Sequence, residues 1–128
     1  HPLLGRASLH ASLVAGGTGL STYPDRCTLA LERRTLPGER AEDVVREIEA
    51  ACERVRARRP SFAADVSLAF AQPPSDVPAA APIVRALADA LAACALPAPI
   101  AGMSAWTDAA LLNAAGIPAI CFGPGDVA

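Results

Sequence analysis

The segment from residue 41 to residue 59 constrains the fold most, because its apolar side chains recur every three or four positions. The apolar stripe consists of Val44, Val45, Ile48, Ala51, Cys52 and Val55. Glu42 and Asp43 stand in the first turn and arginines in the last, an order that favours the helix dipole. Pro60 ends the pattern. The sequence therefore predicts a long amphipathic helix that needs an apolar surface to cover.

Three further segments alternate apolar and polar residues, which is the pattern of half-buried strands. They cover residues 8–14, 26–34 and 62–70. The expected faces of the first strand are Leu9, Ala11 and Leu13 against Ser8, His10 and Ser12. The order strand, strand, helix, strand predicts the second half of a split βαβ sheet, with the helix covering one face.

A proline-rich break at residues 72–78 divides the chain and predicts two parts, residues 1–72 and residues 73–128. The second part begins with an apolar stripe over residues 82–95, which indicates another helix. A short strand is expected at residues 100–103.

The stretch that follows Trp106 has a layout that can build a site. It contains a polar turn with Thr107 and Asp108, a short helix ended by Gly116, a strand over residues 117–122 and a Gly-Pro-Gly loop at residues 123–125. Ligands gather where the strands of open α/β sheets end, so Thr107, Asp108 and this loop could converge on one pocket. On spacing alone, an ordinary helix-to-strand corner is the simpler interpretation, because such glycines and prolines are common in connections.

Composition excludes some classes of partner. The net charge of −2 argues against nucleic acid, which requires a concentrated basic face. No run of about 18 uncharged apolar residues could span a membrane. The cysteines are too widely spaced for zinc clips and are expected to be reduced core residues of a cytoplasmic protein: Cys27, Cys52, Cys94 and Cys121. With no Met or leader before His1, we expect a piece of a longer protein.

The two histidines, His1 and His10, have no histidine or carboxylate at ligand spacing, so neither a catalytic residue nor a metal site is predicted within the chain. His10 shares a strand face with Ser12, but no orienting acid is near it in the sequence, and we interpret it as an outward polar residue. The glycines at 16–19 do not form a phosphate loop, because they lead to Pro24 and a strand rather than to a helix.

Two sets of motifs point to one enzyme family. The first set is Gly16-Gly17, Ser21-Thr22-Tyr23-Pro24, Glu32-Arg33-Arg34 and Pro37-Gly38. The second set is Thr107-Asp108, Ala115-Gly116-Ile117-Pro118 and Phe122-Gly123-Pro124-Gly125. In this order they resemble the two-metal amidohydrolases that include acetylornithine deacetylase, succinyl-diaminopimelate desuccinylase, aminoacylase and carboxypeptidase G.

This resemblance implies an α/β protein with an α+β lid. Residues 1–72 would be the second half of a ferredoxin-like βαββαβ lid, with an antiparallel sheet and helices on one face. Residues 73–128 would be a helix–helix–strand piece of the α/β zinc-peptidase catalytic domain. The first strand and helix of the lid, and a metal-binding histidine after the Gly-Pro-Gly loop, are expected outside this sequence. The lid also implies a homodimer.

The resemblance further implies that Ser21, Gln72, Trp106 and Thr107 contact substrate, while Asp108 supports the site from behind. Ser21 replaces a family asparagine and Gln72 a family arginine, so carboxylate recognition would be weaker or would use another group. Trp106 stands where the family has glycine, which predicts a narrower pocket. Two zinc ions are implied, with their ligands outside this chain.

The predicted function is therefore part of a metal-dependent amidohydrolase that removes an acyl group from an N-acyl amino acid or cleaves a small peptide. This piece is expected to be inactive by itself. The alternative is a non-catalytic pairing module with no metal site, whose exposed edge strand extends a partner's sheet. A third interpretation, a small-ligand regulatory domain, rests on fold analogy only.

Overall fold

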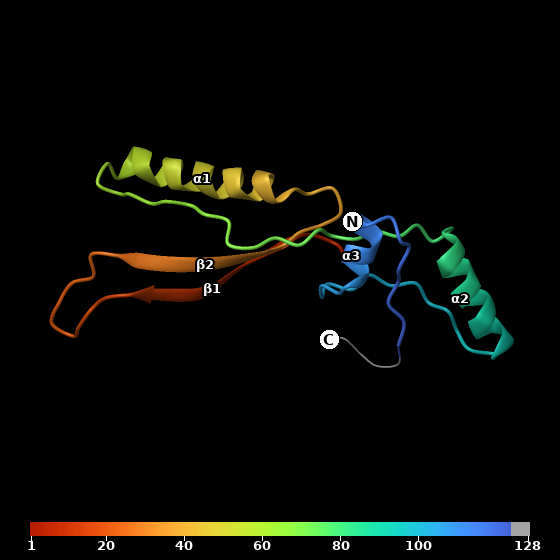
Figure 1. Ribbon diagram of the computed structural model, residues 1–128. Coiled ribbons are helices and arrows are strands. Elements are labelled where there is room, and N and C mark those ends of the chain that lie inside the picture. Colours follow the sequence, from red (N-terminus) through yellow and green to blue (C-terminus); the bar gives the residue numbers. More distant parts are fainter. Residues whose placement is uncertain (124–128) are drawn as a thin grey trace.

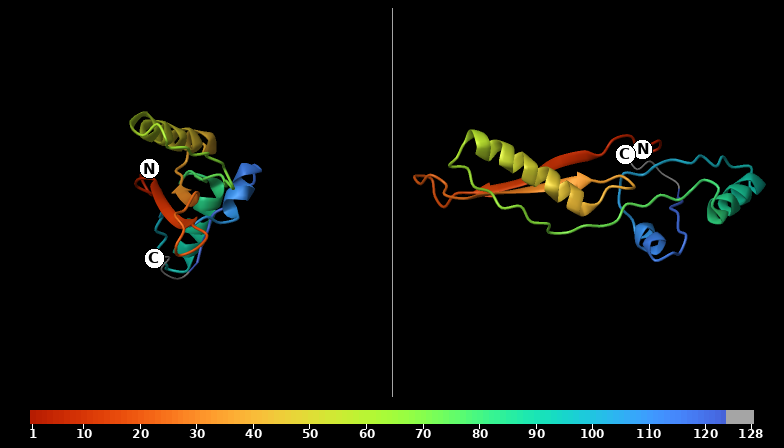
Figure 2. Two further views of the ribbon diagram at one scale, coloured as in Figure 1. Left: turned by 90° about the vertical axis from the view of Figure 1, so that its left-hand side faces the viewer. Right: turned by 90° about the horizontal axis from the view of Figure 1, so that it is seen from above.

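A computed structural model describes residues 1–123. Its elements follow in the order β1 (Ser8–Gly16), β2 (Cys27–Arg34), α1 (Ala41–Arg58), α2 (Pro82–Ala93) and α3 (Ala109–Ala114). The chain is elongated, with β1, β2 and α1 at one end, α2 at the other and α3 between them (Figure 1 and Figure 2). Helices and a two-stranded antiparallel sheet agree with the predicted α+β lid.

β1 and β2 form an antiparallel hairpin that contains a β-bulge. Ala11 pairs with Leu31, and the next pair joins Leu13 to Ala30. Ser12 is therefore an extra residue, and an extra residue reverses the faces of all that follow it. The predicted alternation is wrong beyond this point, because Leu13 lies on the face opposite to that of Ala11.

α1 has the ends that its sequence predicts to within one residue. It begins after Arg40 and is capped at its C-terminus by Arg59, whose backbone N–H donates to the carbonyl of Val55. Its apolar stripe is only half-buried, and Val55 is 41% exposed. The segment after Pro60 runs back beneath the helix and gives the stripe partial cover (Figure 1).

Residues 62–70 follow an extended course but form no strand, so the predicted third strand is wrong. The alternation itself is real, because Phe62, Ala64 and Val66 are half-buried while the residues between them are exposed. What is missing is a backbone partner among residues 1–123. In a split βαβ unit a further strand lies between the two parallel ones, so β2 cannot supply the ladder for this segment.

Arg33 ties the end of β2 to the turn before α1, an arrangement that we call the Arg33 clamp. Its Nη2 donates to Oε1 of Glu39 at 2.6 Å, and Oε2 of Glu39 accepts from the Leu36 N–H at 2.8 Å. Nη1 of Arg33 lies 3.8 Å from Oε2 of Glu47 on α1. The hydrogen bond from Arg33, with that from Leu36, lowers the pKa of the Glu39 carboxyl, and the same contact raises the pKa of Arg33.

α2 and α3 confirm the two helices predicted in the second part of the chain. Gly116 follows α3 with a φ of 79°, the left-handed conformation that ends helices and that glycine adopts without strain. On α3, Nδ2 of Asn113 donates to Oγ of Ser75 and to the carbonyl of Ala119, both at 2.8 Å. Its Oδ1 accepts from the Ala119 N–H at 2.9 Å. One side chain thus fastens two other segments to α3.

The strands predicted at residues 100–103 and 117–122 are wrong. Neither segment forms a strand, although both are apolar and short enough to be one. A strand needs a neighbour to satisfy its backbone groups, and residues 1–123 supply none at these places.

These residues form almost no core. Ala110 is the one buried apolar side chain among residues 1–123, while Val14 and Phe70 are 72% and 74% exposed. The four cysteines are free, as expected, but the expected core location is wrong: Cys27, Cys94 and Cys121 are exposed and Cys52 is half-buried. None of the helices that residues 1–123 form is long and apolar enough to cross a membrane. So much exposed apolar surface is typical of an interaction surface.

Candidate functional site

Trp106, Thr107 and Asp108 occupy the turn that leads into α3. The carbonyl of Thr107 accepts from the Ala110 N–H at 3.0 Å, and that of Asp108 accepts from the Leu111 N–H at 3.0 Å. Asp108 is the N-cap residue, yet its carboxylate makes no capping hydrogen bond. The indole of Trp106 is exposed. The helix therefore fixes the backbone of this turn and leaves the side chains of Trp106 and Asp108 accessible.

Thr107 meets the segment that leads toward the predicted Gly-Pro-Gly loop. Its Oγ1 lies 3.3 Å from Sγ of Cys121, and either atom can be the donor. Asn113 holds the same segment to α3 through Ala119. The predicted convergence of Thr107 and Asp108 with the loop at residues 123–125 stays a prediction. Pro124 and Gly125, which complete the loop, lie outside the described residues.

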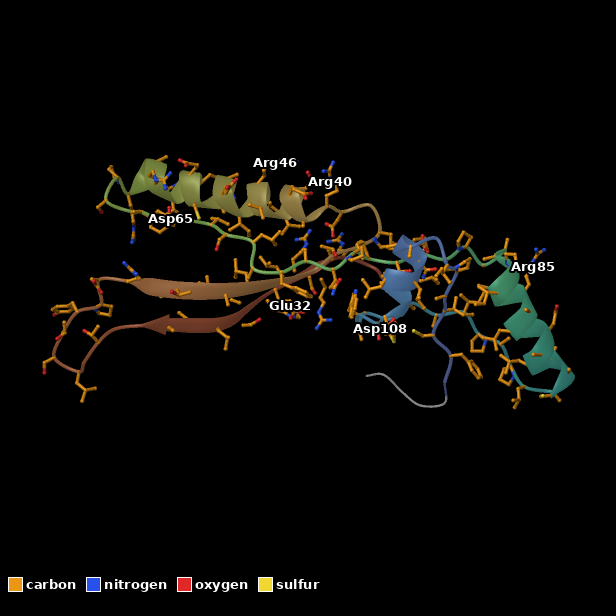
Figure 3. All side chains as sticks on the ribbon, in the orientation of Figure 1. Glu32, Arg40, Arg46, Asp65, Arg85 and Asp108 are labelled. Carbon is orange, nitrogen blue, oxygen red and sulfur yellow. The ribbon has the colours of Figure 1, made fainter. Side chains whose placement is uncertain are left out.

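A row of polar contacts connects the same turn to the hairpin. Nη1 of Arg34 donates to the carbonyl of Ser104 at 3.2 Å, and its Nε lies 2.8 Å from Oε1 of Glu32. Oε2 of Glu32 lies 3.8 Å from Nδ1 of His10. Figure 3 shows Glu32 and Asp108 in the central part of the molecule, where the hairpin approaches α3.

The acid beside His10 was missed in the sequence. Glu32 is distant along the chain, and only the antiparallel register places it directly opposite His10. His10 is exposed, as predicted, so water screens its pairing with Glu32. If the register of the hairpin had been known, residues directly opposite each other could have been paired, and Glu32 would have been identified as the neighbour of His10.

Ser21 lies away from this turn. Ser21 is exposed in the loop between β1 and β2, where the Thr22 N–H donates to the Gly19 carbonyl at 3.3 Å. That loop is at the far end of the hairpin from α3 (Figure 1). Gln72 is half-buried in the segment between α1 and α2. Ser21 and Thr107 therefore do not share a pocket formed by residues 1–123 alone.

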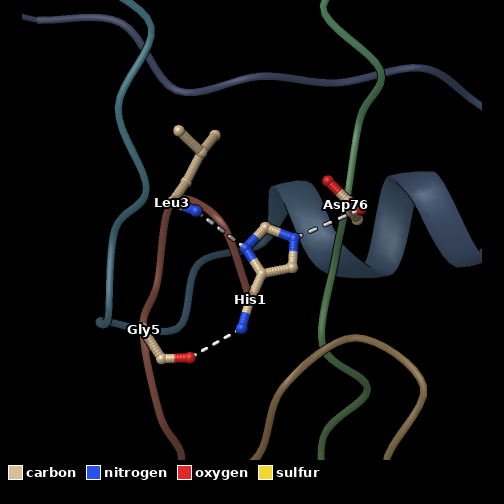
Figure 4. A network of polar contacts seen from close by, with 4 residues as sticks. All are labelled: His1, Leu3, Gly5 and Asp76. Atoms are coloured by element: carbon tan, nitrogen blue, oxygen red, sulfur yellow. Dashed lines mark hydrogen bonds and ion pairs between the residues drawn. The ribbon is translucent and has the colours of Figure 1, made fainter.

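His1 ties the N-terminal segment to the linker between the two parts. Its Nε2 lies 3.4 Å from Oδ2 of Asp76, and its Nδ1 accepts from the Leu3 N–H at 3.2 Å (Figure 4). The amino group of His1 donates to the Gly5 carbonyl at 2.7 Å. Gly102 leaves room for this segment, since a Cβ there would lie 2.6 Å from the Leu3 carbonyl oxygen.

The donor groups of residues 1–123 do not fit a catalytic zinc ion. No group of three or more His, Cys, Asp or Glu side chains is placed to hold a metal in this part of the chain. Each histidine has one carboxylate partner, Glu32 for His10 and Asp76 for His1. A catalytic zinc site takes three protein ligands.

Comparison with known proteins adds one finding. Residues 3–59 match the family model described as the peptidase dimerisation domain. This span contains β1, β2 and α1, so the match supports membership of the corresponding peptidase family. No curated protein and no solved structure gives a significant match to the chain.

Proposed function

We propose that this chain is the dimerisation lid, with an adjoining part of the catalytic domain, of a metal-dependent amidohydrolase of the peptidase family. The match over residues 3–59 carries the proposal, because it covers the hairpin and α1 as one unit. In this proposal residues 1–72 are the lid, and residues 73–128 belong to the catalytic domain. The substrate is an N-acyl amino acid or a small peptide, and the protein is cytoplasmic.

The turn before α3 is the proposed substrate-facing surface of this chain. Its backbone is fixed by α3, and Thr107 is held against Cys121, while the side chains of Trp106 and Asp108 remain accessible. In our proposal Trp106 and Thr107 contact the substrate and Asp108 supports the site. In the same proposal Ser21 and Gln72 contact the substrate from the lid. Ser21 is distant from the Trp106 turn, so the lid must move before both can contact one substrate molecule.

The metal-ligating side chains within residues 1–123 do not form a zinc site. In our proposal the ligands of both zinc ions therefore lie in other segments of the protein. When bound, zinc supplies Lewis-acid polarisation of the scissile carbonyl. The part assigned to this chain is to orient the substrate at the Trp106 turn and to cover it from the lid.

The test uses the full-length protein. Purified protein is assayed for hydrolysis of a panel of N-acyl amino acids and dipeptides, and bound zinc is measured by elemental analysis. We expect hydrolysis of at least one substrate class, loss of activity on chelation and recovery on adding zinc. Full-length protein that binds no divalent metal and hydrolyses none of the panel would contradict the proposal.

Trp106→Gly tests the substrate-facing assignment. Removing the indole should widen the pocket, so kcat/KM for substrates with bulky acyl groups should rise by about tenfold relative to N-acetyl substrates. Trp106→Phe, which keeps a large ring, is the matched control and should leave the preference nearly unchanged. An unchanged substrate range in Trp106→Gly would remove this residue from the site.

The second proposal is a pairing module without catalysis. The misfit between the donors of residues 1–123 and zinc favours it, as does the unpaired edge of β1 in this part of the chain. The two proposals differ in one measurement. A pairing module forms dimers yet neither binds zinc nor hydrolyses the substrate panel.

A further inference from the structure

The hydroxyl of Thr107 has one hydrogen-bond partner among residues 1–123, the thiol of Cys121. Oγ1 of Thr107 and Sγ of Cys121 lie 3.3 Å apart. Thr107 is half-buried in the turn before α3, and Cys121 lies 14 residues later, in the segment that follows this helix. The contact therefore joins the proposed substrate-facing turn to a second segment of the chain.

Hydrogen bonds to α3 restrain both partners. On one side, the carbonyl of Thr107 accepts from the Ala110 N–H at 3.0 Å. On the other side, Asn113 donates to the Ala119 carbonyl at 2.8 Å and accepts from the Ala119 N–H at 2.9 Å. Ala119 precedes Cys121 by only two residues, so the bonds that fasten it to α3 also limit where the thiol can lie. The distance between hydroxyl and thiol is therefore set by the helix that carries the turn.

The contact between Thr107 and Cys121 can be made in two ways, because either atom can be the donor. A threonine hydroxyl has one hydrogen to donate, and a thiol is a weak donor and a weak acceptor. If the hydroxyl donates to Sγ, its only hydrogen is used and Oγ1 can only accept from a substrate. If the thiol donates to Oγ1, the hydroxyl hydrogen is free for another acceptor. The direction of this hydrogen bond thus decides which substrate groups Thr107 can bind.

We propose that Cys121 is a positioning residue whose thiol donates to Oγ1 of Thr107 and leaves the threonine hydroxyl free to donate to the substrate. The inference rests on the proposed function, in which Thr107 contacts an N-acyl amino acid or a small peptide. The carboxylate and carbonyl oxygens of such substrates are acceptors. A free hydroxyl donor fits them, whereas a hydroxyl that already donates to Cys121 does not.

The expected effect is moderate because Cys121 is exposed. Water can take the place of the thiol beside Oγ1 when the thiol is removed, but a water molecule either donates to this oxygen or accepts from it. The hydroxyl would then spend part of its time turned away from the substrate. Substrate binding should weaken without being abolished.

The test measures kcat and KM of the full-length protein with the substrate that it hydrolyses best. Cys121→Ala removes the donor, so KM should rise about fivefold while kcat stays within about twofold, as expected for a weakened contact made equally in the ground and transition states. Cys121→Ser supplies another donor and should return KM to within about twofold of the unchanged protein. Cys94→Ala changes an exposed cysteine at the end of α2 and is the matched control that should alter neither constant.

Thr107→Val separates positioning from a general effect on folding, because valine is branched like threonine but has no hydroxyl. When Cys121→Ala is added to Thr107→Val, KM should rise by less than about twofold further, since no hydroxyl is left to orient. A fivefold rise in both backgrounds would overturn the inference, as would an unchanged KM in Cys121→Ala or a Cys121→Ser that behaves like Cys121→Ala. Each of these results leaves the proposed function intact. Full-length protein that hydrolyses no substrate would overturn the proposed function and the inference with it.

Discussion

The hairpin with α1 and the part from α2 to Phe122 are held together by different kinds of contact. Backbone hydrogen bonds join β1 to β2 along their length, and the Arg33 clamp ties β2 to the entrance of α1. In the second part no ladder forms, and Asn113 and the Thr107–Cys121 contact carry the connections between segments. A ladder adds many weak bonds in one register, whereas the second part depends on a few side chains. The hairpin therefore has a regular set of contacts that the second part lacks.

Both parts lack a hydrophobic core. Hydrophobic burial is the main favourable term in folding, but Ala110 is the one buried apolar residue among residues 1–123. Exposed apolar side chains lie on the hairpin and around α3 alike, for example Val14 and Phe122. Each part consequently needs a covering surface.

The largest effect is expected from Arg33→Met, which removes the clamp between β2 and the turn before α1. It removes two charge-assisted contacts of a side chain that is 21% exposed, so the hairpin with α1 should lose about 2 kcal/mol of unfolding free energy. Hydrogen exchange of the full-length protein should show the loss in residues 27–36 and little change in residues 113–119. Arg26→Met, at an exposed arginine just before β2 that forms no ion pair within residues 1–123, is the control and should change protection little. Equal loss of protection in both parts would show that they are not independent.

Asn113→Ala should have a smaller and more local effect of about 1–2 kcal/mol, because it removes three partly buried hydrogen bonds. The amide of Ala119 should exchange faster, while β1 and β2 keep their protection. Asn113→Asp retains the acceptor for the Ala119 N–H and loses the two donated hydrogen bonds. Its loss of unfolding free energy should therefore be smaller than that of Asn113→Ala. If Asn113→Ala leaves the Ala119 amide protected, other contacts hold this segment.

The smallest effect is a difference in pH dependence. Contact with Arg33 lowers the pKa of Glu39 from its ordinary value of 4.5, so the stabilisation is complete above pH 4.5 and is lost as pH falls through the lowered value. Because Glu39 is partly exposed, we expect no more than about 1 kcal/mol. The Asn113 contacts involve neutral groups and should not respond in this range. Glu39→Gln should flatten the acid loss in the hairpin, and an unchanged acid profile would remove Glu39 as its source.

The predictable elements of this fold are those with local signals. The stripe from Val44 to Val55 specifies α1, and Gly116 marks the end of α3, since a helix satisfies its backbone groups within one segment. The apolar segments at 62–70, 100–103 and 117–122 were predicted as strands and are not, because a strand depends on a neighbour that the local sequence does not describe.

The candidate site divides in the same way. The grouping of Trp106, Thr107 and Asp108 at the start of α3 was predictable because they are adjacent in sequence. The contacts of Asn113 with Ser75 and Ala119 were missed, since a single amide side chain that bonds a distant hydroxyl and a nearby backbone group has no periodic signature. The sequence also did not predict that Ser21 lies far from the Trp106 turn, because this distance depends on the direction in which the hairpin extends.

The sequence by itself determined the helices and the two segments that become β1 and β2, all of which follow from spacing along one segment. Only the tertiary structure decided that Glu32 faces His10 and that Ser12 reverses the faces of β1. The physical reason is that strand register and side-chain burial depend on how two segments of the chain pack against each other. They are set by backbone pairing and packing at a distance, which periodicity within one segment does not contain.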